Sequence, residues 1–319
     1  MRVGWLYRFP GLVLLLSVTA CGTPEDPVNN TKQMTDGMSI QAAAEVAEGG
    51  GEVSTAGFDA NGWFATAVTS TPMAALVANG LYPDLYLGTN LEEVETEQFK
   101  GPWWYRTELE VSEADANKVA RLQFAGLNYT ADIWLNGEQL AAHNMVVGAF
   151  RVHELDVSGR LVAGQNVLAV AVHPPQPGDF TIGFVDWNPR PPDNNMGIWR
   201  PVTLRLTGDV TLNDVVVRTD VDLETLQSAE IIVSAVVRNH SDAEVKTTVN
   251  GRIEDIRFAA DVILAPHEAQ LVKFTPEDYD ALEMDEPRLW WPHTLGEPNL
   301  YSMTLTAEVG GTISDAAQT

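Results

Sequence analysis

The most constraining feature of the sequence is a long series of short alternating segments that turn-forming residues separate. VARLQFAGL, TADIWLNGEQLAAH and AEIIVSAVVRNHSD each place apolar side chains at about every second position. This period is typical of β-strands with one face in a core. Asn136-Gly137 lies between two such runs and predicts a two-residue hairpin. Since little helical periodicity occurs between the segments, the sequence predicts an all-β fold of antiparallel sandwiches.

The segments fall into two groups, and a chain of 319 residues is long enough for two domains. The first group closes near Gly208, which assigns residues 55–208 to one sandwich. The second group, residues 209–319, has the length and strand spacing of an immunoglobulin-like sandwich. One short helix is expected over residues 74–78, because Asn79-Gly80 is a typical helix C-cap.

The N-terminus has the pattern of a secretory signal. Residues 1–20 contain two arginines, an apolar run too short to cross a bilayer, and small residues before Cys21. The stretch Val18-Thr19-Ala20-Cys21 resembles the lipobox of bacterial lipoproteins. That resemblance implies cleavage before Cys21, lipidation of Cys21 and a place in the bacterial cell envelope. The alternative is a plain secretory signal with an incidental cysteine.

Residues 21–54 are predicted to be a flexible tether between this anchor and the sandwiches. The part that follows Cys21 is polar and rich in turn formers. Residues 41–57 favour a short helix at best, because the run Gly49-Gly50-Gly51 should break it.

Charge and cysteine content exclude several kinds of site. The formal net charge of −25 disfavours nucleic acids as partners and excludes a polybasic membrane footprint. Cys21 is the only cysteine, so intramolecular disulfides, thiolate metal sites and cysteine nucleophiles are excluded. His143, His153, His173 and His293 share no metal-ligand spacing. We therefore predict no metal and no cofactor.

The stretch DWNPRPPDNNMGIWRP, residues 186–201, is the strongest candidate for a binding site. Its prolines restrict the backbone before any ligand arrives, and its polar and aromatic side chains suit the hydroxyls and apolar faces of a sugar. The candidate sugar contacts are Asp186, Trp187, Asn188, Asp193, Asn194 and Asn195. The alternative is that the Asp and Asn side chains cap the loop's own backbone. Trp199 is expected in the core.

Asp186 and Asp193 do not make a convincing catalytic pair. A glycosidase needs two carboxylates about 5–9.5 Å apart, whereas seven extended residues span about 20 Å.

The sequence also contains two pairs of adjacent tryptophans. One of Trp103 and Trp104 should point inward by alternation, and Trp290-Trp291 is expected in a core or an interface.

Four stretches together resemble a known family. They are GPWWYRTELEV, LQFAGLNYTADIWLNGEQLAAH, DWNPRPPDNNMGIWRPV and RLWWPHTLGEPNLY. They resemble the N-terminal half of glycoside hydrolase family 2, in its exo-β-D-glucosaminidase and β-mannosidase branches. The segment PDLYLGTNLEE (83–93) also resembles a part of the family that lies near the substrate pocket.

The resemblance implies a galactose-binding-like jelly roll over residues 55–208 and an immunoglobulin-like domain, cut short at its C-terminal end, over residues 209–319. The resemblance also implies that a (β/α)₈ barrel with two catalytic Glu residues follows these domains. This sequence does not contain that barrel. Asp186 would contact the terminal sugar, and the asparagines and Asp193 would line or support the pocket. No catalytic residue is assigned to this chain, so whether it is an enzyme stays open.

Three functions remain in competition. The first is the non-catalytic portion of a retaining hydrolase that removes terminal β-linked glucosamine or mannose, with sugar contacts here and cleavage in the barrel. The second is a stand-alone, surface-tethered carbohydrate-binding lipoprotein. The third is a non-functional fragment whose barrel-facing surface is left bare.

Overall fold

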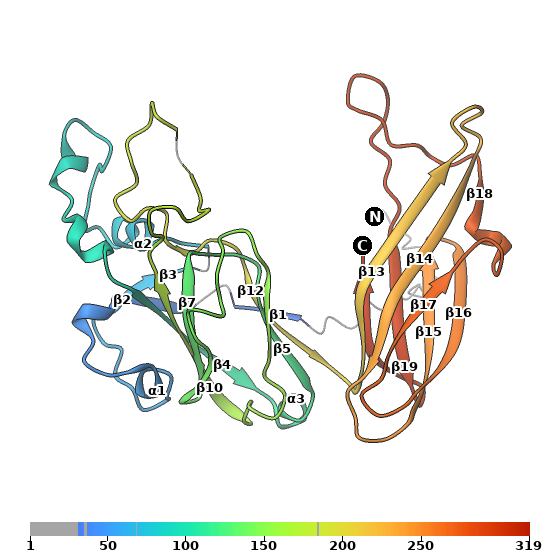
Figure 1. Ribbon diagram of the computed structural model, residues 1–319, viewed down its shortest axis with the longest axis horizontal. Helices are drawn as coiled ribbons and strands as arrows, with labels where there is room; N and C mark the ends of the chain where they lie inside the picture. The colour runs from blue at the N-terminus through green and yellow to red at the C-terminus, as the bar shows by residue number, and fades with distance from the viewer. Residues whose placement is uncertain (1–30, 35–36, 68, 184) are drawn as a thin grey trace, which may run out of the picture.

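The computed structural model describes residues 31–34, 37–67, 69–183 and 185–319. Strands dominate, helices are short, and the described chain forms two β-sandwiches side by side (Figure 1). The prediction of an all-β fold is therefore confirmed. The expected signal, residues 1–20, and the expected lipidation site, Cys21, lie outside the described residues. None of the helices in the described ranges is both long and apolar enough to cross a membrane.

The first sandwich packs a six-stranded sheet on a four-stranded sheet. The strand order is β3-β2-β4-β10-β7-β8 in the larger sheet and β1-β12-β5-β9 in the smaller one. The larger sheet contains β2 (Met38–Ala42), β3 (Phe64–Thr66), β4 (Trp103–Val111), β7 (Thr130–Leu135), β8 (Glu138–Ala141) and β10 (Gly164–His173). The smaller sheet contains β1 (Thr31–Gln33), β5 (Val119–Phe124), β9 (His153–Asp156) and β12 (Val202–Thr207), while β6 (Leu127–Asn128) pairs with β11 (Gly197–Ile198).

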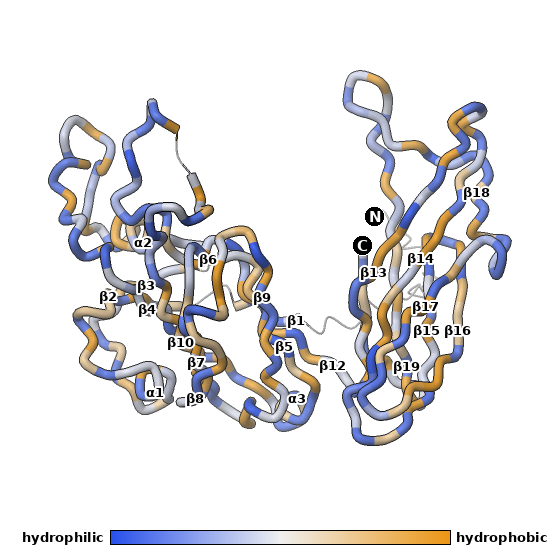
Figure 2. Tube along the Cα trace, in the orientation of Figure 1, coloured by the Kyte–Doolittle hydropathy of each residue, from blue (hydrophilic) through white to orange (hydrophobic). Residues whose placement is uncertain are grey.

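Alternation along the strands builds the core between these two sheets. Ile133 on β7 and Phe124 on β5 are 0% exposed, and Tyr105 on β4 is 1% exposed. Figure 2 shows apolar and polar residues alternating along the strands of both sandwiches. The predicted hairpin is confirmed at Asn136-Gly137, where both residues have positive φ, as its tight turn between β7 and β8 requires.

The outer face of the six-stranded sheet is also covered, which the sequence did not indicate. Trp103 lies in the inter-sheet core, but Trp104 on the opposite face is only 6% exposed. The Trp104 ring lies 5.4 Å from the ring of Trp134, under the short helix α1 (Gly50–Val53). One tryptophan of the pair thus points into the inter-sheet core, as alternation predicts, and the other is buried on the opposite face.

The predicted tether is wrong for residues 31–33, which pair with β12 as β1, and for residues 38–54. β2 pairs with both β3 and β4 inside the larger sheet, and its Ile40 is 0% exposed. α1 begins within the glycine run rather than being broken by it. A Cβ on Gly50 would lie 2.3 Å from the Trp134 ring, so the helix packs there because the residue has no side chain.

The predicted helix before Asn79-Gly80 is confirmed as α2 (Pro72–Ala78). The Thr71 side chain accepts a hydrogen bond from the Ala74 backbone N–H, and Gly80 has a φ of +81° beyond the helix end. The other short helices are α3 (Glu113–Ala116), η1 (Ala43–Glu45), η2 (Asn90–Glu93), η3 (Thr96–Phe99) and η4 (Asp280–Leu282).

The second sandwich consists of two four-stranded sheets with a separate core. The first of these sheets has the strand order β13-β14-β17, with β18 also paired to β14. The second sheet has the order β16-β15-β19-β20. Its strands are β13 (Val210–Val221), β14 (Ser228–Asn239), β15 (Val245–Ile253), β16 (Ile256–Leu264), β17 (Ala269–Phe274), β18 (Glu283–Asp285), β19 (Met303–Val309) and β20 (Thr312–Gln318).

A polar cluster joins the two sandwiches where β12 leads into β13. The Asp315 carboxylate on β20 is 0% exposed and accepts hydrogen bonds from Arg205 on β12 and from the Leu212 backbone N–H at 2.7 Å. The Arg205 guanidinium also donates to the Leu212 carbonyl at 3.0 Å. One buried ion pair therefore holds strands of both sandwiches together.

Candidate functional site

The candidate loop rises from one end of the first sandwich, between β10 and β11. Figure 1 shows it in yellow-green beside the blue-green segment that holds η2 and η3. A groove of about 600 Å³ lies between the two, lined by Leu91 and Lys100 on one side and by Arg190, Pro192 and Asn194 on the other. The fold thus brings the loop next to the segment around residues 83–93.

The first half of the loop faces solvent. Trp187 is 83% exposed, and Asp186 and Asn188 are also exposed. The Asn188 backbone N–H donates to the Val185 carbonyl at 3.0 Å, which closes a tight turn around Asp186 and Trp187. This turn presents a carboxylate, an amide and an indole face to solvent.

Asp193 is placed differently from these residues. It is 2% exposed, and one carboxylate oxygen accepts from the Met73 backbone N–H at 2.9 Å while the other accepts from the Asn195 N–H at 3.0 Å. Burial raises the pKa of Asp193 despite these hydrogen bonds. Asp193 therefore fastens the loop to the start of α2, and its expected role as a direct sugar contact needs correction, because its carboxylate is sealed inside the protein.

Asn194 and Asn195 hold the bend that follows, and both are half-buried with positive φ. The Asn194 amide oxygen accepts from Arg190 at 2.9 Å, and the Asn195 amide donates weakly to the Ile182 carbonyl at 3.4 Å. Asn128 donates to the Asn195 carbonyl at 2.8 Å. Asparagine tolerates this left-handed backbone better than most residues, so part of the loop's asparagine content serves its own conformation.

An exposed aromatic cluster beside the loop was not predicted. Trp199 is half-buried rather than fully in the core, and its indole N–H donates to the Ala149 carbonyl at 2.8 Å. The Phe150 ring lies 5.6 Å from both the Trp199 ring and the Phe180 ring. Phe150 is 51% and Phe180 is 80% exposed. Neither phenylalanine belongs to a recognisable motif, so only the fold reveals this apolar surface.

The second aromatic loop, residues 288–301, does not bury its tryptophans. Trp290 is 58% and Trp291 is 39% exposed. The Trp291 ring packs on Gly296, where a Cβ would lie 2.9 Å from the indole. The expected burial of Trp290 in a core or between the two sandwiches is not found among the described residues.

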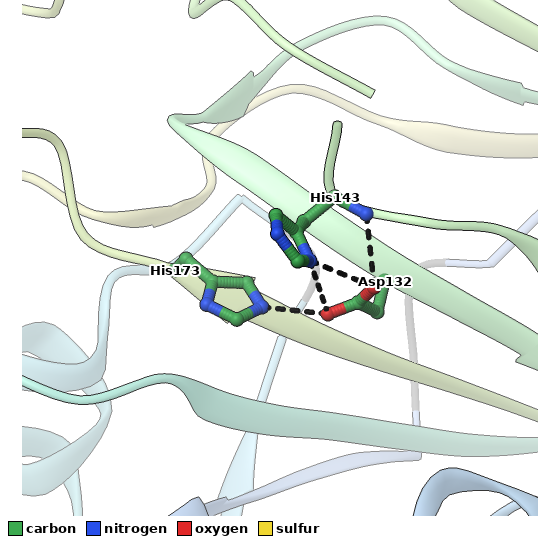
Figure 3. Close-up of side chains that lie close together, drawn as sticks. All are labelled: Asp132, His143 and His173. Atoms are coloured by element: carbon green, nitrogen blue, oxygen red, sulfur yellow. Dashed lines mark hydrogen bonds and ion pairs between the residues drawn. The ribbon is translucent and has the colours of Figure 1, made fainter. Parts of the chain in front are cut away.

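The histidines conceal a cluster that sequence spacing did not indicate. Figure 3 shows the rings of His143 and His173 close together, with the carboxylate of Asp132 beside both of them. Burial acts to raise the pKa of Asp132, but hydrogen bonds from His173 and His143 outweigh it, and the pKa lies below its usual value. Strand pairing brings these three residues together across large gaps in the sequence.

One family model matches within each of the two sandwiches. The family described as "Glycosyl hydrolase 2 galactose-binding domain-like" matches residues 45–180, and "Glycosyl hydrolases family 2" matches residues 210–319. The chain belongs to glycoside hydrolase family 2. The family that the sequence motifs indicated is thus confirmed.

Individual relatives agree with the family assignment. The chain is 39% identical over 294 residues to an exo-β-D-glucosaminidase of Streptomyces avermitilis, covering 92% of this chain and 32% of the relative. A mannosylglycoprotein endo-β-mannosidase of Lilium longiflorum is 28% identical, covering 78% and 29%. An exo-chitosanase of Amycolatopsis orientalis, solved with PNP-β-D-glucosamine, matches with a TM-score of 0.84 and 38% identity, covering 91% and 33%. The chain thus spans about a third of the length of these relatives.

Proposed function

We propose that the first sandwich binds a terminal β-linked glucosamine unit of an oligosaccharide at the exposed turn of residues 186–188. The turn combines a carboxylate for the sugar's amine, an amide for its hydroxyls and an indole for its apolar face. The relatives named as exo-β-D-glucosaminidases, and the glucosamine derivative bound to one similar structure, support this choice of sugar.

The observation that carries the proposal is the exposure of Trp187. An indole that is 83% exposed leaves a large apolar surface in water. A sugar ring stacked on this face would remove that surface from water. Lys100 and Arg190 in the adjoining groove would repel an ammonium group, so we assign amine recognition to Asp186.

Charge distinguishes glucosamine from mannose as the preferred sugar. The chain has a formal net charge of −25, which attracts a cationic amino sugar and leaves neutral mannose unaffected. We expect glucosamine oligosaccharides to bind more weakly as ionic strength rises, whereas any binding of mannose should change little. Calorimetric titrations of both sugars at low and high salt measure this difference.

Replacement of Trp187 by alanine tests the stacking platform. We expect Trp187→Ala to weaken binding of glucosamine oligosaccharides roughly tenfold, about 1.4 kcal/mol, with the free energy of unfolding unchanged. Trp290→Ala is the matched control, because Trp290 is also exposed but lies in the second sandwich. Equal affinities for both variants and the unaltered chain would refute this role of Trp187.

We further propose that bond cleavage takes place in a barrel domain of the whole enzyme, with retention at the sugar's anomeric carbon. The loop then contributes binding energy and orientation to a reaction performed elsewhere. This chain alone should bind PNP-β-D-glucosamine without releasing nitrophenol. If the protein still released nitrophenol after a second purification, catalytic groups would have to lie within these two sandwiches.

A surface-tethered sugar-binding lipoprotein is the second candidate, and the signal pattern before Cys21 favours it. We propose that the chain is lipid-anchored in a bacterial cell envelope through Cys21. Cells that express the chain should incorporate a radiolabelled fatty acid into it, and Cys21→Ser should abolish the label. A barrel-coding frame downstream of codon 319 would favour the hydrolase over the stand-alone binding protein.

A further inference from the structure

We propose that Asp132, His143 and His173 form a binding site for a divalent transition-metal ion such as Zn²⁺. The site would lie on the outer face of the six-stranded sheet and is independent of the proposed sugar contacts. Its three side chains converge, each offers a donor atom that such metals accept, and one side of the cluster is open to solvent.

Two adjacent strands and the turn after a third supply one residue each. Asp132 lies on β7 opposite Ala171 of β10, and His173 is two positions further along β10 on the same face. His143 follows the end of β8, which pairs with the other edge of β7. Asp132 alternates with the buried Ala131 and Ile133, so its side chain points away from the inter-sheet core.

The distances between the donor atoms suit a single small cation. His173 Nε2 lies 2.7 Å from one Asp132 carboxylate oxygen, and His143 Nδ1 lies 3.1 Å and 3.2 Å from the two oxygens. One donor atom from each residue lies within 4.8 Å of the other two. Tetrahedral zinc with bonds of about 2.0–2.1 Å separates its ligand atoms by about 3.4 Å. Small rotations of the two imidazoles would therefore enclose the ion.

The ligand set discriminates among metals. Two imidazoles and one carboxylate favour zinc and its neighbours, whereas magnesium and calcium prefer oxygen ligands. The His143 side chain is 57% exposed and the His173 side chain 29% exposed, which leaves room for water on the metal. The Asp132 carboxylate is held in place by the His143 backbone N–H at 2.9 Å, the kind of outer support that orients metal ligands.

A hydrogen-bonded Asp–His–His cluster without a metal is the competing explanation. The chain contains a useful control for it, since His267 forms a simple pair with Asp242 at 2.9 Å on the second sandwich. If a single His–Asp pair were sufficient for metal binding, this pair would bind zinc too. Of these two sites, the Asp132 cluster alone adds a second imidazole, which comes from a neighbouring strand.

The test is a calorimetric titration of Zn²⁺ into the chelator-treated chain. We expect one zinc per chain, with affinity reduced at least about tenfold by His143→Gln and by His173→Gln and unchanged by His267→Gln. Bound zinc should also raise Tm, because the metal binds the folded state. Failure of the unaltered chain to bind zinc, or equal affinity in all four proteins, overturns the proposal.

Cobalt provides a measurement that does not depend on the variants folding. Co²⁺ added to the unaltered chain should produce the intense visible absorption of a tetrahedral site with nitrogen ligands, and excess Zn²⁺ should remove it. NMR signals of the imidazoles of His143 and His173 should shift on addition of Zn²⁺, while those of His267 stay in place. A weak octahedral cobalt spectrum with unmoved histidine signals would contradict the site.

Discussion

At the scale of single residues, the loop of residues 186–195 contains two aspartates in opposite environments. Asp186 is exposed, whereas Asp193 is buried and accepts hydrogen bonds from two backbone N–H groups. The first is available to a ligand and the second maintains the loop's shape. Residue type alone does not distinguish these roles, because both are aspartates in a run rich in proline and asparagine.

Replacement of Asp193 by alanine should destabilise the first sandwich. The N–H groups of Met73 and Asn195 would lose their acceptors in a buried place, and we expect the free energy of unfolding to fall by about 1–3 kcal/mol. Asp186→Ala is the matched control and should change it by less than about 0.5 kcal/mol. Urea denaturation of the three proteins measures both effects, and equal losses would contradict the assignment.

Asp193 should also make the free energy of unfolding depend on pH in a defined direction. Burial raises the pKa of Asp193 in the folded state above its unfolded value. Its contribution to stability is therefore full below the unfolded pKa and declines as pH rises through the folded pKa. The destabilisation caused by Asp193→Ala should be larger at mildly acidic pH than at neutral pH. A destabilisation that grows with rising pH would contradict this sign.

At the scale of elements, helix α1 shows how packing overrides local preference. Glycine disfavours helix, yet α1 starts at Gly50 because its backbone lies directly on the Trp134 ring. The helix covers the outer face of the larger sheet and buries Trp104 and Val53. Three consecutive glycines therefore occupy positions with quite different surroundings.

Alanine at each of these glycines should separate the close contact from helix preference. Gly50→Ala should lower the free energy of unfolding by about 1–3 kcal/mol, since its Cβ would lie 2.3 Å from the indole. Gly51→Ala should be neutral or stabilising by up to about 1 kcal/mol, because its Cβ meets nothing closer than 3.5 Å. Thermal denaturation with near-ultraviolet dichroism reports both stability and the Trp134 environment, and a harmless Gly50→Ala would contradict the close packing.

At the scale of the whole molecule, the contact between Arg205 and Asp315 links the two sandwiches. Burial raises the pKa of Asp315 even though the Arg205 guanidinium acts to lower it. A buried carboxylate of this kind depends on its partner, because a charge without compensation in the interior is costly. The relative placement of the two domains therefore rests partly on one ion pair.

Arg205→Leu should destabilise the chain by about 2–3 kcal/mol at neutral pH, since Arg205 is 24% exposed and its loss is less costly than that of a fully buried partner. Without Arg205 the folded pKa of Asp315 rises further, so the deficit should shrink as pH falls and the carboxyl group becomes neutral. Asp315→Asn in the same background should restore part of the loss. Urea denaturation at neutral and mildly acidic pH tests this, and a deficit independent of pH would contradict it.

Local sequence patterns determined much of this protein. Alternation predicted the strands, Asn136-Gly137 predicted the hairpin, and Asn79-Gly80 predicted the end of α2. These features depend on backbone preferences and on which face of a strand a residue occupies, and both are properties of neighbouring residues. The motif of residues 186–202 also carried enough information to indicate the family.

Tertiary structure alone decided which side chains meet. The local pattern of residues 38–54 is typical of a tether, but in the structure β2 pairs within the sheet and Trp134 lies under Gly50. Asp132 lies 11 residues from His143 and 41 from His173, so no local spacing could reveal their cluster. The physical reason is that pleating sets a residue's face locally, whereas its partner across the sheet is set by the order and register of strands distant in the chain.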